Sequence, residues 1–212
     1  MDPEAFVRAH TAVATAPLVP ELTLHLATEV TPLWEATEVE LRRAGLDPPF
    51  WAFAWPGSQA LARWVLDHPA EFAGKRVLDV GSGGGLAAIA VARVGGVGIA
   101  NDVDPFAAAA TRANAALNGV AVETITGDLA GEDVAADVVL AGDVCYSRTM
   151  AERLIAWLRG LARTRRVLLA DPGRAFVPRE GIRPLATFTV PTTMDLESRT
   201  ERETTIAELL AG

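Results

Sequence analysis

From residue 76 onward, the sequence alternates between short apolar runs and longer segments with helical patterns. The short runs are rich in Val, Ile, Leu and Ala, and they span residues 76–80, 97–101, 121–125, 137–141 and 166–170. Strands that are buried on both faces have this composition, and helices that separate such strands are typical of parallel sheets. The sequence therefore predicts an α/β fold built on a parallel sheet.

Helices are predicted before and between these strands, at residues 58–67, 86–94, 105–118 and 148–161. Pro105 lies in the first turn of one predicted helix. A backbone N–H at this place would have no hydrogen-bond partner within the helix, so proline is tolerated there. After the fifth strand, residues 185–190 and 203–209 are rich in Thr, Val and Ile. They predict an antiparallel pair that closes one edge of the sheet.

The N-terminal third is harder to interpret. Residues 1–30 carry only weak helix and turn signals, and prolines interrupt residues 31–50. We therefore expect one compact domain with two parts, an N-terminal extension over residues 1–70 and a core over residues 71–212.

Composition excludes several classes of protein. The 212 residues are 50% hydrophobic and 22% charged, which suits a globular core and not a disordered chain. No apolar run is long enough to span a membrane, and acids at Asp2 and Glu4 argue against a secretory or organelle leader. The net charge of −8 argues against a nucleic-acid partner. A single cysteine, Cys145, fits a cytoplasmic protein.

Positive charge gathers in and just after the helix at residues 148–161. The arginines concerned are Arg148, Arg153, Arg159, Arg163, Arg165 and Arg166. Two interpretations stay open, a solvated helix face or a docking surface for an acidic partner.

The first strand of the regular pattern leads into a glycine-rich loop. Gly81, Gly83 and Gly85 separate this strand from a helix, and glycines there let the backbone turn sharply and approach a ligand closely. The helix start offers unpaired N–H groups to an anion. The G-x-G-x-G spacing differs from the dinucleotide fingerprint, and no P-loop Lys follows. A purely structural turn remains the alternative to a cofactor loop.

Acidic residues follow the next three strands, namely Asp102, Asp128 and Asp143. Because the carboxyl ends of parallel strands meet at one edge of the sheet, we expect the three carboxylates to line one crevice. Asp102 can accept both hydroxyls of a ribose, and Asp128 can reach an adenine amino group. Each acid alone could equally be a helix cap or a turn residue. Together with the glycine loop, the set indicates a cofactor site.

These residues resemble the S-adenosylmethionine site of the Rossmann-like, seven-stranded class I methyltransferases. Further segments at residues 50–61, 100–105, 142–146 and 170–174 are similar to the group of protein-lysine methyltransferases that modify the β subunit of electron transfer flavoprotein. The likeness covers residues 28–210. It implies a seven-stranded sheet, S-adenosylmethionine as cofactor, a protein substrate, no metal, and an N-terminal extension that frames the acceptor.

The resemblance also implies a set of cofactor-binding residues, which are Trp55, Asp79, Gly81, Ser82, Gly83, Asp102, Asp128 and Leu129. The loop residues would hold the methionine and ribose end, Asp102 the ribose, and Asp128 with Leu129 the adenine. Trp55 would wall the methionyl end, unless it is a core tryptophan between the N-terminal segment and the sheet.

Asp143 and Tyr146 match the Asp-x-x-Tyr signature of the group, which implies a catalytic role at the mouth where a target lysine enters. Relatives often carry an aromatic residue where this chain has Cys145. Cys145 has no histidine nearby in the sequence, so we do not expect a nucleophilic thiol.

The function expected from the sequence is methylation of a lysine in the flavoprotein β subunit. Methylation of another protein, such as a ribosomal protein, or of a small amine is the alternative within the same reaction. A nicotinamide-dinucleotide dehydrogenase and a non-catalytic cofactor-binding protein are the alternatives outside it.

Overall fold

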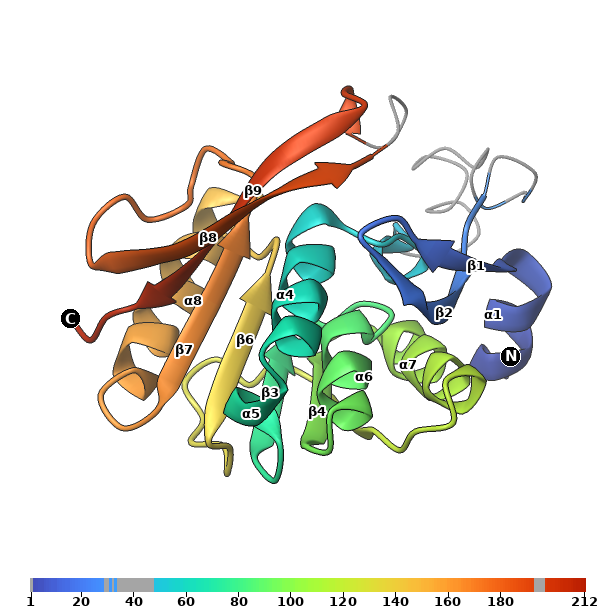
Figure 1. Cartoon of the computed structure of the whole chain (residues 1–212), viewed down its shortest axis with the longest axis horizontal. Coiled ribbons are helices and arrows are strands. Elements are labelled where there is room, and N and C mark those ends of the chain that lie inside the picture. The colour runs from blue at the N-terminus through green and yellow to red at the C-terminus, as the bar shows by residue number, and fades with distance from the viewer. Residues whose placement is uncertain (1, 29–30, 32, 34–47, 193–196) are drawn as a thin grey trace.

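The computed structural model describes residues 2–28, 31, 33, 48–192 and 197–212. Of residues 31–50, for which the sequence made no prediction, residues 32 and 34–47 lie outside the described part. A seven-stranded sheet forms the centre of the molecule, with helices on both faces (Figure 1). This confirms the α/β, Rossmann-like class that the sequence predicted.

The sheet has the strand order β5-β4-β3-β6-β7-β9-β8. Its strands are β3 (Arg76–Val80), β4 (Val97–Asp102), β5 (Glu123–Thr126), β6 (Val138–Gly142), β7 (Arg166–Asp171), β8 (Ile182–Pro191) and β9 (Glu201–Leu209). The first five pair in parallel, and β9 runs antiparallel to both β7 and β8. The predicted parallel sheet and its antiparallel edge pair are confirmed.

Helices cover both faces of this sheet. They are α4 (Pro56–Asp67), α5 (Pro69–Phe72), α6 (Leu86–Arg93), α7 (Pro105–Leu117) and α8 (Arg148–Leu161). On one face, Leu61 of α4 and Ile89 of α6 join the core cluster of Leu140. On the other face, Leu158 of α8 packs in the cluster of Val139. Successive residues of the central strands β6 and β7 face opposite clusters, which explains why these two strands are apolar on both faces.

The N-terminal part forms α1 (Pro3–His10), a hairpin of β1 (Ala12–Ala16) and β2 (Val19–Leu26), and a short 3-10 helix η1 (Phe50–Ala52). The expectation of weak helix and turn signals missed the hairpin. Asn114 of α7 and Asn118, which directly follows this helix, bond to the backbone of β2. Asn118 bonds both the N–H and the C=O of Thr23, and Asn114 Oδ1 accepts from His25 N at 2.7 Å. Because Asn114 and Asn118 lie far from β2 along the chain, no local sequence pattern predicted these contacts.

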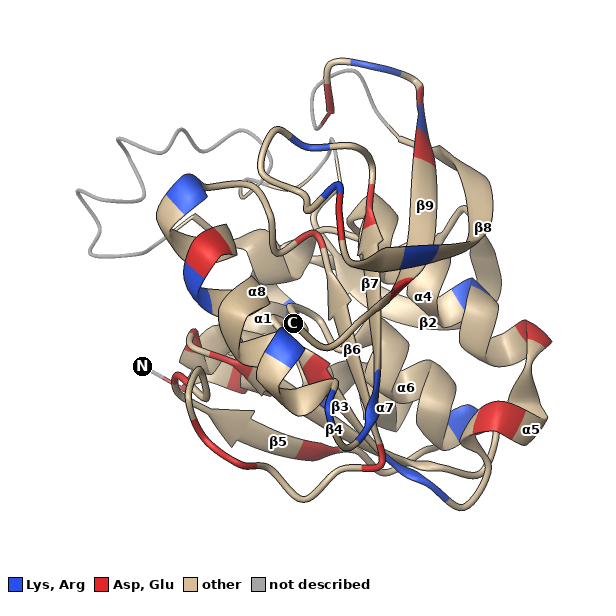
Figure 2. Ribbon diagram, turned by 90° about the vertical axis from the view of Figure 1, so that its left-hand side faces the viewer, with Lys and Arg blue, Asp and Glu red and all other residues tan. Residues whose placement is uncertain are grey.

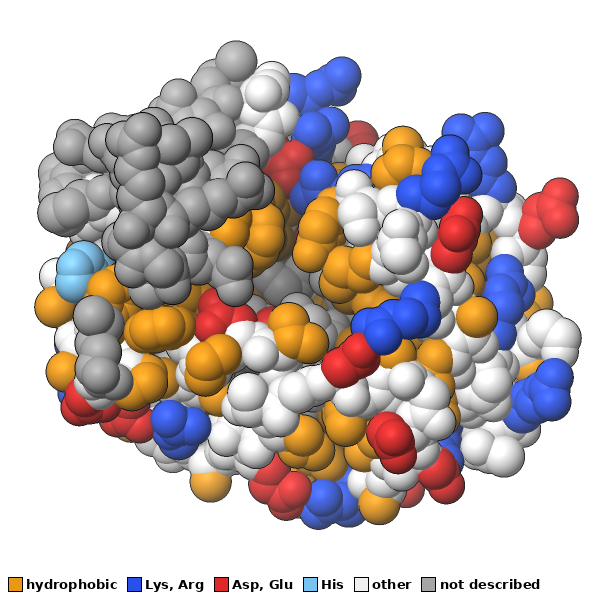
Figure 3. Space-filling model, turned by 180° about the vertical axis from the view of Figure 1, so that it is seen from behind, with side chains coloured by type: hydrophobic (Ala, Val, Ile, Leu, Met, Phe, Trp, Pro, Cys, Tyr) orange, Lys and Arg blue, Asp and Glu red, His pale blue; other side chains and the backbone are white. Residues whose placement is uncertain are grey.

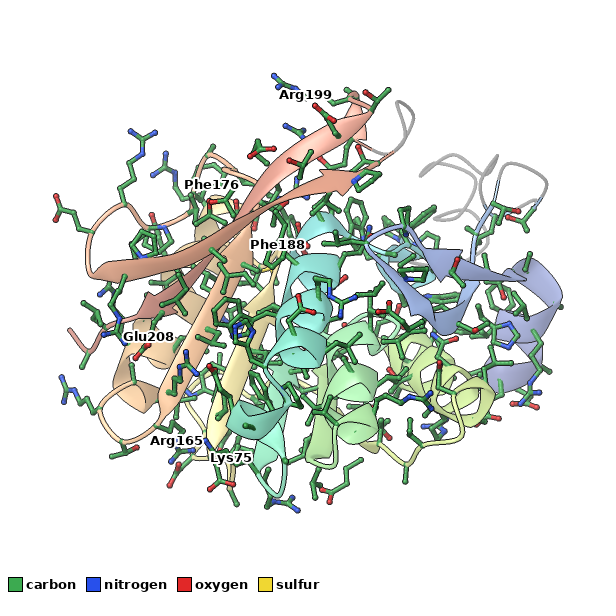
Figure 4. The ribbon with its side chains drawn as sticks, in the orientation of Figure 1. Lys75, Arg165, Phe176, Phe188, Arg199 and Glu208 are labelled. Atoms are coloured by element: carbon green, nitrogen blue, oxygen red, sulfur yellow. The ribbon has the colours of Figure 1, made fainter. Side chains whose placement is uncertain are left out.

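The pair β8–β9 extends beyond the rest of the sheet. β7 pairs with Thr205–Glu208 of β9, whereas Glu201–Thr204 pair with Phe188–Pro191 of β8 alone. We call residues 188–192 and 197–204 the projecting arm. It reaches past the carboxyl ends of β6 and β7 (Figure 1), and Figure 4 labels Arg199 at its far end and Lys75 at the opposite end of the molecule. The arm therefore lies on the side where a ligand of this fold binds.

Candidate functional site

A pocket of about 830 Å³ opens at the carboxyl ends of β3, β4, β5 and β6. It has the size of a small-molecule site. Residues of the glycine loop, the β2 strand, η1, α8 and the projecting arm all contribute to its walls. Figure 3 shows the molecule hollowed on this face, with hydrophobic side chains around the hollow. Of the sequence-predicted site residues, all except Asp79 line this pocket.

The glycine loop forms the floor of the pocket. Gly81, Gly83 and Gly85 have φ angles of 64°, 52° and 78°, a left-handed conformation that favours glycine. A Cβ on Gly85 would lie 2.6 Å from Thr111, so α7 packs directly against the loop. Asn114 of α7 donates to Gly84 O at 2.9 Å. The loop is thus fixed from behind by α7, and its open side faces the pocket.

Asp102 connects the end of β4 to this loop. Its Oδ2 accepts from Gly83 N at 2.9 Å, and its Oδ1 accepts from Asp104 N at 3.1 Å. A carboxylate oxygen has two lone pairs, so each oxygen can still accept another donor on the pocket side. The position suits an acceptor for two ribose hydroxyls.

Asp128 and Leu129 follow β5 and line the pocket together with Met150 of α8. Asp128 accepts from Ala130 N at 3.0 Å and forms an ion pair with Arg153. These two donors hold the pKa of the Asp128 carboxyl below its usual range, and the Ala130 N–H has the larger effect. One carboxylate beside apolar side chains suits the flat ring and amino group of an adenine.

Asp79 is buried at 3% exposure beneath the glycine loop and does not line the pocket. It accepts from Ala88 N of α6 at 3.3 Å. Burial raises the pKa of Asp79 to about 7. We therefore expect this carboxyl to stabilise the first turn of α6 and not to contact the cofactor directly.

Asp143 caps the first turn of α4 from a distant part of the chain. Its Oδ2 accepts from Gly57 N at 2.6 Å and from Ser58 N at 3.2 Å. The residue that precedes the helix, Trp55, makes no side-chain cap. A carboxylate at these two N–H groups satisfies donors that a helix start leaves unpaired. The Arg174 guanidinium lowers the pKa of Asp143, but burial has the larger effect and raises this pKa to about 7.

This contact leaves no room for a side chain at position 57. A Cβ on Gly57 would lie 2.6 Å from both Ala170 O and Asp143 Oδ2. Gly57→Ala is therefore expected to lower the free energy of unfolding by about 1–3 kcal/mol, measured by urea denaturation. Gly160→Ala is the matched control, because Gly160 lies in α8 with no atom within 4 Å of its added Cβ. It should leave stability equal or about 0.5–1 kcal/mol higher, and equal losses in both variants would contradict the close packing at Gly57.

Aromatic side chains border the end of the pocket that holds Asp143. Phe50, Trp55 and Tyr146 all line it, and the Phe50 ring lies 5.9 Å from Trp55 and 5.7 Å from Tyr146. Phe50 is 48% exposed and Tyr146 is 52% exposed. Trp55 Nε1 donates to Phe50 O at 2.8 Å, which fixes its ring at the pocket wall. Trp55 is therefore a pocket residue and not a core tryptophan, and its role toward a cofactor stays a prediction.

Arg174, in the loop after β7, lies at the same end. Its Nη2 donates to Asp143 Oδ1 at 3.1 Å and to Glu197 Oε1 at 2.7 Å. Arg202 of β9 donates to Glu197 Oε2 at 3.0 Å. We call Asp143, Arg174, Glu197 and Arg202 the ion bridge. The sequence analysis included Arg174 only as part of residues 170–174, and it did not identify Glu197 or Arg202. No sequence spacing relates these two residues to Asp143.

Cys145 is buried beside this site, and burial raises the pKa of its thiol to about 12. A thiol with this pKa stays protonated at neutral pH and is a poor nucleophile. The expectation of a non-nucleophilic cysteine agrees with this environment.

Figure 2 shows basic and acidic positions along α8 and the segments beside it, and the arginines of α8 and its exit have partners within the chain. Arg153, Arg165 and Arg166 pair with carboxylates of Asp128, Asp133 and Glu71, respectively. Arg148 lies over the Phe176 ring and 3.6 Å from Glu152. Arg159 and Arg163 donate to backbone carbonyls. This favours a structural and solvated helix face over a docking surface for an acidic partner.

Within the described residues, no group of three His, Cys, Asp or Glu side chains could hold a metal ion. In the same part of the chain, no helix is both long and apolar enough to cross a membrane.

A model of the ribosomal protein L11 methyltransferase family matches residues 62–147. The chain is 38% identical to a Danio rerio protein named electron transfer flavoprotein beta subunit lysine methyltransferase, over 85% of this chain and 72% of that protein. It is 40% identical to the Xenopus laevis protein of the same name, over 82% of this chain and 71% of that protein.

Among solved structures, the fold is similar to that of magnesium protoporphyrin IX methyltransferase from Synechocystis PCC 6803 with bound S-adenosylmethionine. The TM-score is 0.53 at 22% sequence identity, over 72% of this chain and 77% of that chain. This likeness concerns the fold.

Proposed function

Because this chain belongs to the family of the electron transfer flavoprotein β-subunit lysine methyltransferases, we propose that its methyl acceptor is a lysine of that β subunit. The chain is an S-adenosylmethionine-dependent methyltransferase. The observation that supports a lysine acceptor is that the aromatic rings of Phe50, Trp55 and Tyr146 line the same pocket as Asp143.

The pocket residues fit S-adenosylmethionine. We propose that Asp102 accepts the ribose hydroxyls, and that Asp128 and Leu129 contact the adenine. The loop at Gly81–Gly83 would lie along the ribose and the methionine part. When bound, this cofactor supplies a methyl group that is already activated on a sulfonium. The protein has to hold an amine in line with that methyl group and to exclude competing water.

The amine has to react in its uncharged form. A free lysine has a pKa of about 10.4, so fewer than about one in a thousand is neutral at pH 7. Contact with the rings of Phe50 and Tyr146 removes water from the lysine stem, which favours the neutral amine. A charged Asp143 has the opposite effect on the lysine pKa. We therefore propose that Asp143 orients the amine or offsets the positive charge of the sulfonium, and does not act as a strong general base.

Residues 1–70 provide one wall of the proposed acceptor site, since Phe50 and Trp55 lie in this part. We propose that this extension frames the acceptor, while residues 71–212 supply most of the cofactor site. We also propose a cytoplasmic protein without a metal, a nucleic-acid partner or a membrane partner. The single cysteine and the net charge of −8 support this proposal.

The substrate is tested by transfer of tritium from labelled S-adenosylmethionine to purified electron transfer flavoprotein. We expect label on the β subunit with the wild-type enzyme, and a much lower rate with Asp143→Asn. Label on a different protein of a cell lysate, with none on the β subunit, would refute the substrate and leave the methyltransferase activity intact.

Ribosomal protein L11 is the second candidate acceptor, because the matching family model carries that name. The match covers residues 62–147, which include the glycine loop and Asp102 but neither Phe50 nor Arg174. The same assay with purified L11 separates the two candidates. Label on L11 and none on the flavoprotein would favour this second function.

A further inference from the structure

Arg174 contacts three separate elements at the acceptor end of the pocket. Its guanidinium bonds Asp143 at the end of β6 and Glu197 in the projecting arm. The same group lies 5.8 Å from the centre of the Trp55 ring, just before α4. Its own backbone N–H donates to Asp171 Oδ1 at 2.6 Å, which anchors the loop after β7. Arg174 therefore joins the arm to two walls of the pocket.

The arm itself belongs to the pocket wall. Glu197, Ser198 and Arg202 line the same pocket as the glycine loop. The Glu197 side chain is only 2% exposed, and both of its oxygens accept from arginines. A buried carboxylate is costly without partners, and each of these two guanidinium groups offsets part of its charge.

We propose that Arg174 is a positioning residue for the methyl acceptor: it fastens the projecting arm to Asp143 and Trp55, so that the arm forms the second wall of the acceptor site. This inference rests on the proposed function, since it takes Asp143 to face the acceptor. The partner of this wall is the protein surface around the target lysine.

The charge of Asp143 depends on its surroundings, and Arg174 is the cation that faces it. Asp171 of β7 carries a carboxylate that raises the pKa of Asp143 further, and α4 contributes the N–H groups of Gly57 and Ser58. Cys145 and Tyr146 follow on the same chain segment, and burial raises the pKa of both groups, so both are neutral at pH 7. Loss of the Arg174 charge should therefore move the titration of Asp143 to higher pH.

The test uses two variants at position 174 and one in the arm. Arg174→Met removes the charge and its hydrogen bonds, and Arg174→Lys keeps a charge but cannot bridge two carboxylates equally well. Glu197→Gln weakens the attachment of the arm and leaves Arg174 beside Asp143. Arg183→Met is the control. Arg183 is an exposed residue of β8 that pairs with Glu208 of β9, and it lies outside the pocket.

For Arg174→Met, we expect an S-adenosylmethionine Kd within about twofold of wild type and a fall of about tenfold in kcat/KM for the protein acceptor. Arg174→Lys should recover part of this loss. Glu197→Gln should mainly raise KM for the protein acceptor. An unchanged KM in Glu197→Gln, or a parallel loss of cofactor affinity and rate in Arg174→Met, would overturn the proposal.

A second measurement needs no acceptor protein. The carboxyl carbon of Asp143, observed by ¹³C NMR and assigned with Asp143→Asn, should titrate at higher pH in Arg174→Met than in wild type. In Arg174→Lys it should stay near the wild-type value. An unshifted titration in Arg174→Met would refute the electrostatic part of the inference even if the flavoprotein proves not to be the substrate. Failure of the wild-type enzyme to label the flavoprotein would instead refute the proposed function.

Discussion

Asp143→Asn is expected to lower methyl transfer to protein by about a hundredfold or more, which corresponds to about 2.7 kcal/mol of transition-state stabilisation. The substitution keeps the size of the side chain and removes its charge. An amide offers one oxygen where the carboxylate serves Gly57, Ser58 and Arg174 with two. Its NH₂ group would face one of these donors, so the acceptor end loses both charge and geometry.

Cofactor affinity should remain near normal in this variant, because Asp102, Asp128 and the glycine loop are unchanged. Isothermal titration with S-adenosylmethionine and single-turnover kinetics measure the two effects separately. Asp137→Asn is the matched control: Asp137 lies at the other end of β6, where its carboxylate accepts from Arg76 N at 2.8 Å. Loss of cofactor affinity in proportion to rate would place Asp143 on the methionine amino group. Unchanged activity would reduce it to a cap for α4.

The same variant should change the pH dependence of the rate. The pKa of Asp143 is raised to about 7, so its negative charge is present above this pH and is lost as the pH falls through it. The ratio of wild-type rate to Asp143→Asn rate should therefore be largest above pH 7 and should shrink below it. A ratio that stays constant between pH 6 and pH 9, roughly one unit below and two above that pKa, would contradict a role for the charged form.

Asp102→Ala is expected to weaken S-adenosylmethionine binding by about 2–4 kcal/mol, or roughly thirtyfold to a thousandfold in Kd. The substitution removes the proposed acceptor for two ribose hydroxyls. It also removes the hydrogen bond that Gly83 N donates to this carboxylate at 2.9 Å, so the loop loses a contact.

Equilibrium titration of the two variants Asp102→Ala and Asp104→Ala decides between neighbouring carboxylates. Asp104 also lines the pocket, and its side chain accepts from Phe106 N at the start of α7. We expect a large effect for Asp102 and a small one for Asp104. A Kd within twofold of wild type for Asp102→Ala, with a large increase for Asp104→Ala, would move the ribose contact to Asp104.

The glycine loop and the acids that line the pocket beside it could be predicted, because their positions follow from local patterns. Gly81, Gly83 and Gly85 need a left-handed backbone at a strand-to-helix turn, and only glycine adopts it without cost. Asp102 is the last residue of β4, Asp128 comes soon after β5, and the ends of parallel strands meet at one edge. Asp79 shows the limit of this reasoning, because it belongs to the same motif but lies beneath the loop and outside the pocket.

The sequence by itself determined the parallel sheet, the glycine loop and the row of acids, since strand and helix periods and their spacing act over a few residues. Tertiary structure alone decided which groups those acids contact. Asp143 meets Gly57 and Ser58, which lie more than 80 positions earlier, and Arg174, which lies 31 positions later. The hairpin β1–β2 likewise bonds to Asn114 of α7 and to Asn118 just after this helix. Contacts of this kind depend on how whole elements pack, because burial and hydrogen bonding are satisfied only in the assembled chain.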